Sequence, residues 1–145
     1  MLTVRVEASG LPKIVDRLNK IDKRLVPALD RDVLEGAKMI SQTAKGLAPY
    51  DKGILSKGIY TRKAGHLKAI VKSNLPYDIY QELGFMMTEK MIKAMAAKGI
   101  LKPSGKNMRY PHWVQNPFMR PAKNINTPVI REMVRNTIRQ IIGGK

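Results

Sequence analysis

Residues 75–85 read LPYDIYQELGF, and the rest of the chain is organised around this stretch. Pro76 disfavours a helical conformation for the residue before it, so a preceding strand is expected to end here. Three side chains then recur at roughly helical spacing: Tyr77, Tyr80 and Glu82. Gly84 can end a short helix by adopting a left-handed conformation. The stretch therefore predicts the end of a strand followed by a short, capped helix.

Two carboxylates lie four residues apart in this helix, Asp78 and Glu82. Such a pair on one helical face is compatible with acid–base catalysis or with metal binding. The alternative is a helix that docks two aromatic rings while Glu82 acts as a cap or pairs with a lysine. No histidine or third carboxylate lies nearby in the sequence, which favours this structural alternative. We therefore predict no catalytic residue, no cofactor and no metal site.

The chain is strongly basic and has the size of one domain. Its 145 residues include 27 Lys and Arg against 11 Asp and Glu, giving a net charge of +16. Residues 52–77 carry six basic residues and no acid, and residues 90–145 carry twelve basic residues and one acid. Such an excess favours a polyanion or an acidic protein as the partner. Cysteine is absent, and neither a signal peptide nor a membrane span is expected.

The N-terminal third predicts one strand and two helices. Three apolar residues alternate with polar ones, as in a half-buried strand: Leu2, Val4 and Val6. Apolar residues at helical spacing follow from Leu11 to Leu25 and from Leu29 to Leu47. Because proline lacks the amide donor and clashes with the preceding turn, a break is expected at Val26-Pro27. The second helix, or a continuation of the first, should run from Pro27 to about Gly46.

Residues 54–73 predict a β-hairpin. Strands are expected over Ile54–Arg62 and Leu67–Ser73, joined by a turn at residues 63–66. Lys68 and Lys72 alternate with apolar residues, which gives the hairpin a basic outer face. These elements predict an α+β domain spanning residues 1–145. In it, a small antiparallel sheet with a β-hairpin packs against long N-terminal and C-terminal helices.

Residues 86–110 are interpreted as an insertion into this domain. Thr88 can cap a short helix that ends near Lys98. Three methionines spaced four residues apart form one ridge: Met87, Met91 and Met95. Methionine is flexible and polarisable, so the ridge suits either core packing or an adaptable contact with a subunit or partner. Both interpretations remain open, and we expect the segment to contact other subunits or a partner protein.

The last helix is predicted to begin at Thr127-Pro128, with Thr127 as the cap and Pro128 in the first turn. Its apolar stripe includes Val134 and Ile138, which we expect to be buried. A second stripe on the same helix is basic and repeats every four residues: Arg131, Arg135 and Arg139. The helix should therefore provide the principal packing surface of the domain.

The chain carries three short motifs in a set order. Their residues are Ala48, Pro49, Asp51, Gly53 and Leu55, then Tyr77, Glu82 and Gly84, and finally Pro117, Phe118, Pro121 and Ala122. With a long helix before them, a hairpin between the first two and a helix after the last, they resemble the neck or tail-completion (head–tail joining) family of long-tailed bacteriophages. Three positions depart from that family's usual Thr, Ala and Thr: Lys52, Asp78 and Phe85.

The resemblance implies a structural virion protein with no enzymatic activity. It implies a homo-oligomeric ring, six-fold or twelve-fold, at the head–tail junction around the DNA channel. The neighbours would be head-closure proteins and tail-terminator or tail-tube proteins, and assembly would take place in the host cytoplasm. Genomic double-stranded DNA is a possible partner through its phosphates. The residues that would face DNA or a partner are Lys57, Arg62, Lys63, Lys68, Lys72, Arg131, Arg135 and Arg139.

Two other functions fit the composition. A basic excess supplies sequence-independent affinity for nucleic acid, so a free-standing nucleic-acid-binding protein is the main alternative. It lacks a recognisable zinc finger or other reader motif. A small basic ribonuclease toxin would need a base and a cation from His66, His112 and the lysines and arginines, and their spacing indicates no such site.

Overall fold

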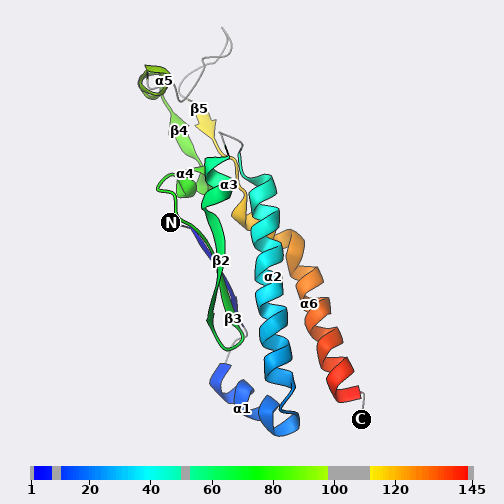
Figure 1. The fold of residues 1–145 in the computed structure, drawn as a ribbon. Coiled ribbons are helices and arrows are strands. Elements are labelled where there is room, and N and C mark those ends of the chain that lie inside the picture. The colour runs from blue at the N-terminus through cyan, green and yellow to red at the C-terminus, as the bar shows by residue number, and fades with distance from the viewer. Residues whose placement is uncertain (1, 8–10, 50–52, 98–111, 144–145) are drawn as a thin grey trace.

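The computed structural model describes residues 2–7, 11–49, 53–97 and 112–143. It has an α+β architecture, as predicted, built around the long helix α2 (Leu25–Leu47). A three-stranded antiparallel sheet packs on one side of α2, and α6 (Met119–Gly143) packs on the other (Figure 1). The short helix α1 (Leu11–Ile21) lies at one end of α2. The expected antiparallel sheet between long N-terminal and C-terminal helices is thus confirmed.

The sheet contains β1 (Thr3–Glu7), β2 (Ile59–Gly65) and β3 (Lys68–Ser73), with β3 in the centre. Val71 lies opposite Val4 on one side and opposite Thr61 on the other. Because side chains alternate across a strand, this register places Val4 and Val71 on the face toward α2. Lys68, Ile70 and Lys72 occupy the other face, although Ile70 is itself buried. The hairpin and its alternation are therefore largely as predicted.

The first hairpin strand begins later than predicted, because residues 54–58 form the short helix α3 (Ile54–Gly58). Gly53 turns the chain with a positive φ of 67°, and the amide of Lys57 donates to its carbonyl. The Ser56 hydroxyl donates to the same carbonyl. This turn directs Leu55 into the core, where it is 3% exposed. The prediction of a strand from Ile54 is wrong, since these local hydrogen bonds favour a helical turn.

The break between the first two helices lies at residues 22–24 rather than at the proline. Asp22 accepts hydrogen bonds from the Arg24 amide at 2.8 Å and from its guanidinium at 2.9 Å. This local arrangement interrupts the helix. Pro27 is the third residue of α2, where an amide has no partner within the helix in any case. The proline is therefore accommodated in the first turn instead of causing the break.

The last helix starts at Met119, and the prediction of a start at Thr127-Pro128 is wrong. Pro128 lies inside α6, and the Thr127 hydroxyl donates to the Lys123 carbonyl at 2.7 Å instead of capping a helix. The fully buried residues of α6 are Met119, Ala122 and Asn126, all before the proline. Val134 and Ile138 are only half-buried in the single chain, contrary to expectation. The late part of α6 thus leaves apolar surface uncovered.

Residues 78–97 and 112–114 form the end of the molecule beyond the sheet (Figure 1). They comprise α4 (Asp78–Leu83), β4 (Phe85–Met87), α5 (Glu89–Ala97) and β5 (His112–Val114). β4 and β5 pair as a separate antiparallel ribbon. The Met91 amide donates to the Thr88 hydroxyl at 3.4 Å, so the predicted cap is present. The proposed insertion thus begins on a strand pair that is distinct from the main sheet.

Helices α2 and α6 approach each other closely at Gly36. A Cβ atom added there would lie 2.9 Å from Cγ1 of Ile130, closer than side chains tolerate. Gly36 is buried, and Ile130 packs against a core cluster that includes Ala37, Ile40 and Phe118. The glycine is therefore required by packing rather than by backbone conformation.

We expect Gly36→Ala to destabilise the protein by about 1–3 kcal/mol, because Ile130 is branched and cannot move aside cheaply. In the same helix, Gly46→Ala meets no atom within 4 Å and is expected to stabilise by up to about 1 kcal/mol. Thermal denaturation of the two variants measures the difference. Equal melting temperatures would contradict the close approach of the helices.

Candidate functional site

Glu82 joins the second and third motifs. Its Oε2 accepts hydrogen bonds from the amides of Phe118 and Met119, both at 2.8 Å, and its Oε1 accepts one from the amide of Arg120 at 2.7 Å. These are amides at the start of α6 that have no partner within that helix. Glu82 is 5% exposed. It is therefore a cap, as one interpretation predicted, but for a helix more than thirty residues away.

Asp78 also serves the backbone, because its Oδ2 accepts a hydrogen bond from the amide of Leu2 at 3.1 Å. Asp78 and Glu82 are both buried, and they hold different segments of the chain. The paired-carboxylate interpretation therefore gains no geometric support. Among the described residues, no group of three or more His, Cys, Asp or Glu could hold a metal ion.

The two tyrosines of the central stretch do not dock as predicted. Tyr77 is 38% exposed and Tyr80 is 56% exposed. The inner positions of α4 are taken by Asp78 and Glu82, so the rings are directed elsewhere. Tyr80 instead packs edge-to-face on Phe85, with ring centroids 6.3 Å apart. The expected docking of both rings is therefore wrong.

The other motif residues complete a junction around Glu82. Leu55, Phe118 and Ala122 share one core cluster, and Ala48 packs against it. Phe118 is fully buried. Leu75 packs closely against Gly58, since a Cβ atom added to Gly58 would lie 3.1 Å from Cγ of Leu75. We call this assembly of the three motifs the motif junction.

The remaining motif residues have mainly backbone roles. Gly84 has φ 88° and ψ 162°, a conformation that favours glycine but is not the left-handed helical cap that was predicted. Pro49 and Pro121 are half-buried, and Pro117 is exposed. Asp51 lies outside the described residues. The motifs thus position the start of α6, and their described side chains form no reactive arrangement.

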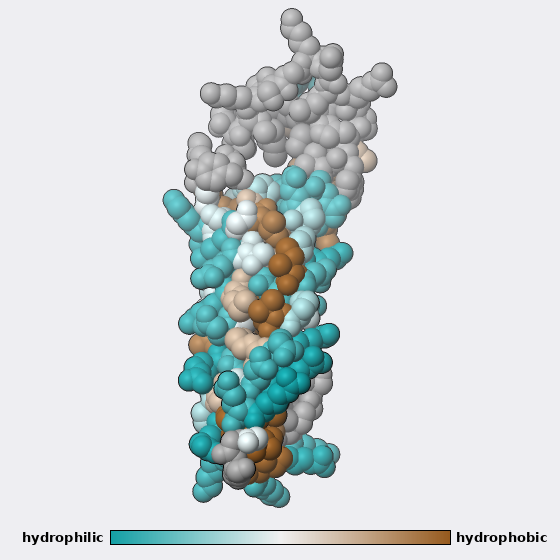
Figure 2. Space-filling view, turned by 90° about the vertical axis from the view of Figure 1, so that its right-hand side faces the viewer, coloured by the Kyte–Doolittle hydropathy of each residue, from teal (hydrophilic) through white to brown (hydrophobic). Residues whose placement is uncertain are grey.

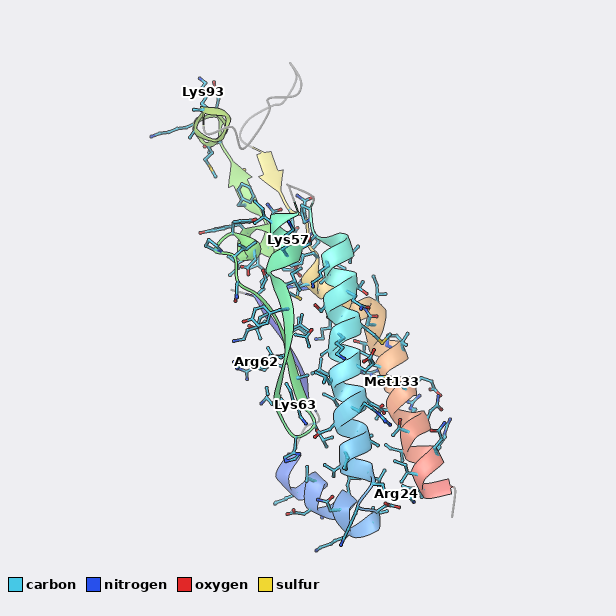
Figure 3. All side chains as sticks on the ribbon, viewed as in Figure 1. Arg24, Lys57, Arg62, Lys63, Lys93 and Met133 are labelled. Carbon is cyan, nitrogen blue, oxygen red and sulfur yellow. The ribbon has the colours of Figure 1, made fainter. Side chains whose placement is uncertain are left out.

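Six of the eight predicted basic residues lie in two groups, one on the sheet and one on α6. Arg62, Lys68 and Lys72 lie on the outer face of the sheet, together with Arg5 of β1. Arg131, Arg135 and Arg139 lie on α6, which packs on the other side of α2 (Figure 3). Glu132 lies 3.5 Å from Arg135 and 3.7 Å from Arg139. The sheet and α6 thus carry distinct basic groups, which come together only where Arg5 and Arg131 line one groove.

Lys57 and Lys63 do not join the outer face of the sheet. Lys57 is exposed on α3. Lys63 lies opposite the inward-facing Ala69, and its ammonium group is 2.8 Å from Asp30 of α2. An intramolecular ion pair thus engages the Lys63 ammonium group, and its expected role toward DNA or a partner stays a prediction.

Asp30 anchors the hairpin turn to α2. It accepts hydrogen bonds from Lys63 and from the amide of Leu67, and its Oδ2 is 3.4 Å from Nδ1 of His66. Leu67 has a positive φ of 51°, which is unfavourable for a leucine, and is 2% exposed. Burial opposes ionisation of Asp30, but Lys63, the Leu67 amide and His66 together hold its pKa below the ordinary value.

A lowered pKa gives a stabilisation that is complete above the unfolded-state pKa, about 4 for an aspartate, and is lost as the pH falls through the folded-state pKa. Asp30→Asn is expected to destabilise the protein by about 1 kcal/mol at pH 7, since the site is partly solvated. Denaturant unfolding from pH 7 to pH 2 should show this difference shrinking below about pH 4. A difference independent of pH would contradict the ionised anchor.

Within the described part of the chain, we distinguish two groups of apolar side chains that are uncovered in the single chain. The first, the α6 flank, consists of Ile125, Val129 and Met133, spaced four residues apart; Ile125 is 58% exposed and Val129 51%. An open groove of about 580 Å³ runs beside it and continues to Gln140. Figure 2 shows apolar residues in a band along the side of the molecule where α6 lies.

The second surface, the α4 patch, consists of Ile79, Tyr80, Leu83 and Met86, each between 38% and 56% exposed. Met91 on α5 is 37% exposed, whereas the side chains of Met87 and Met95 lie outside the described part of the structure. The sequence did not indicate this patch, because the only docking expected of this helix concerned its two tyrosine rings. In α4, which has six residues, Asp78 and Glu82 occupy the buried face. The apolar side chains of this helix therefore lie on its exposed face.

Comparison with known proteins identifies no relative: no protein-family model, curated protein or solved structure matches the chain. Within the residues that the structure describes, no helix has the length and apolarity needed to span a membrane. The side chain of His112 is not described, and His66 is directed to Asp30.

Proposed function

We propose that this protein is a structural component of a bacteriophage neck, forming a ring that joins head and tail around the DNA channel. The observation that carries the proposal is the motif junction. Three segments that resemble the motifs of the tail-completion family meet through Glu82, Phe118 and Leu55. Their contacts are a buried helix cap and core packing. Their roles are positional, which agrees with assembly rather than catalysis.

The two uncovered apolar surfaces support a ring. A closed ring larger than a dimer requires each copy to present two different surfaces, one to each neighbour. The α6 flank and the α4 patch belong to different elements and are both exposed in the single chain. Association that covers them would remove apolar area from water. We infer that they lie at or near the contacts between copies or with the neighbouring neck proteins.

The charge of the chain supports an anionic neighbour. Copies with a net charge of +16 repel one another at close range unless an anion lies opposite them. The outer face of the sheet, with Arg5, Arg62, Lys68 and Lys72, is the basic surface that suits DNA phosphates or an acidic neck protein. Contacts with DNA would be to phosphates alone, because every sequence must pass the neck.

The proposal is tested by a head–tail joining reaction. In an infection in which the gene is inactivated, we expect filled heads and complete tails to accumulate separately. Purified protein added to the extract should restore joined particles. Normal particles formed without the protein would reject the proposed function.

A free-standing nucleic-acid-binding protein is the second candidate, and the basic outer face of the sheet is the observation that favours it. In either case we expect the isolated protein to bind DNA without sequence preference and with strong salt dependence. Lys68→Glu combined with Lys72→Glu should weaken this binding about tenfold or more, whereas Lys13→Glu with Lys20→Glu on α1 should weaken it less.

Size measurement with and without DNA, together with titrations at two salt concentrations, separates the candidates. If the Lys68→Glu/Lys72→Glu variant binds DNA normally but fails to join heads to tails, the outer face of the sheet binds an acidic protein instead of DNA. A wild-type protein that binds DNA but is dispensable for joining would favour the second candidate.

A further inference from the structure

The edge of β1 is the starting point for a separate inference. β1 pairs with β3 on one side, and in the described sheet no strand lies on its other side. The Ser73 amide donates to the Leu2 carbonyl, so the hydrogen-bonded positions of this antiparallel pair are Leu2, Val4 and Val6. The amides and carbonyls of Thr3, Arg5 and Glu7 are therefore directed away from β3, toward the free edge.

A groove runs beside this edge, between β1 and α6, with a volume of about 260 Å³. Its apolar lining comes from three elements: Val4, Val6, Ile40 and Ile130. Its basic lining consists of Arg5, Lys123 and Arg131, all exposed. Thr127 completes the groove, and the described residues that line it include no Asp or Glu. Main-chain hydrogen-bonding groups, an apolar floor and positive charges thus occur together.

We propose that this groove binds an extended, acidic segment of a partner protein, which adds as a strand to the free edge of β1. Strand addition obtains affinity from main-chain hydrogen bonds and specificity from alternate side chains. Side chains directed inward would be apolar and lie over Ile40 and Ile130. Carboxylates directed outward would lie beside Arg5, and those at the ends would reach Lys123 or Arg131. This site does not depend on ring formation.

The basic lining of the groove favours an acidic segment of a different protein over a second copy of this chain. The longest stretch of this chain outside the described residues, residues 98–111, contains four basic residues and no acid. An arm from a second copy would therefore bring like charge to Arg5, Lys123 and Arg131. Repulsion between like charges would disfavour that binding, whereas an acidic segment would be attracted by all three basic side chains. The occupant is accordingly a different protein, and its segment alternates apolar and acidic residues.

The probe is a fluorescein-labelled peptide of sequence GSVEVEVSG, compared with GSVKVKVSG. Fluorescence anisotropy with the full-length protein should detect binding of the first peptide that weakens with salt, and about tenfold or weaker binding of the second. Equal binding of the two peptides, or no binding of the acidic peptide at millimolar concentration, would overturn the proposal.

Two substitutions at one position separate charge from strand pairing. Arg5→Ala removes the charge and keeps the amide, so we expect a loss of about threefold to tenfold. Arg5→Pro also removes the outward amide, which an edge strand tolerates because that amide does not bond to β3. We expect it to lose a further tenfold or so. Equal affinities of the two variants would reject strand addition.

A measurement on the wild-type protein covers the case in which Arg5→Pro does not fold. On addition of the acidic peptide, hydrogen exchange at the amides of Thr3, Arg5 and Glu7 should slow by at least about tenfold, because these amides gain partners. Unchanged exchange at all three amides with the peptide bound would place it elsewhere and overturn the proposal.

Discussion

Glu82→Ala is expected to lower the free energy of unfolding by about 3–5 kcal/mol. The substitution removes a buried carboxylate that accepts three amides from the start of α6. Those amides lie at a buried helix end and would be left without an acceptor. The negative charge at the positive end of the helix dipole is lost as well. In a chain of this size, the melting temperature should fall by roughly 10 °C.

Two controls separate the cap from other effects. Glu82→Gln keeps the shape and one carbonyl oxygen, so its melting temperature should lie between those of the wild type and the alanine variant. Glu89 on α5 is exposed and pairs with Lys93 at 2.8 Å, and Glu89→Ala should leave the melting temperature unchanged. A Glu82→Ala protein that melts within a degree or so of the wild type would contradict the role of Glu82.

Val129→Asp combined with Met133→Asp is expected to abolish ring formation and head–tail joining. Both residues line the exposed groove of the α6 flank. If another copy or a neck protein covers this flank, the variant would bury two unpaired carboxylates, which costs several kcal/mol at each contact. Because Val129 is 51% exposed in the single chain, the fold itself should survive.

The matched control adds the same negative charge elsewhere, by Asn19→Asp with Asn74→Asp at exposed positions. Sedimentation and circular dichroism report the size and fold of each variant, and the joining reaction reports its function. A folded Val129→Asp/Met133→Asp protein that joins heads to tails as efficiently as the control would exclude the α6 flank as an assembly surface.

Local patterns in the sequence predicted the fold class but misplaced several boundaries. The alternation from Leu67 to Ser73 found β3 within one residue. The start of α6 could not be found in the same way, because the acceptor for its first amides is Glu82, 36 to 38 residues earlier. A proline after a threonine is a common helix start, and in this chain that local signal is overridden by a distant cap.

The candidate surfaces depended even more on tertiary contacts. Val134 and Ile138 have the spacing of core residues, yet both are only half-buried. Tyr77 and Tyr80 are large and apolar, but the carboxylates of α4 take the inner positions. Lys63 belongs to a basic hairpin by sequence, whereas its ammonium group is paired with Asp30 of α2. In each case the sequence pattern placed the residue on a helix or strand, but its surroundings depend on residues that are distant in the sequence.

We propose that copies of this chain form a ring between head and tail, and electron cryomicroscopy of the neck of intact particles would image that ring. We expect closed rotational symmetry at the head–tail junction, density that fits α2 between the sheet and α6 in every copy, and the α6 flank and α4 patch covered by neighbouring chains. A neck in which no density accommodates this fold, or in which both surfaces face solvent, would exclude the proposed ring.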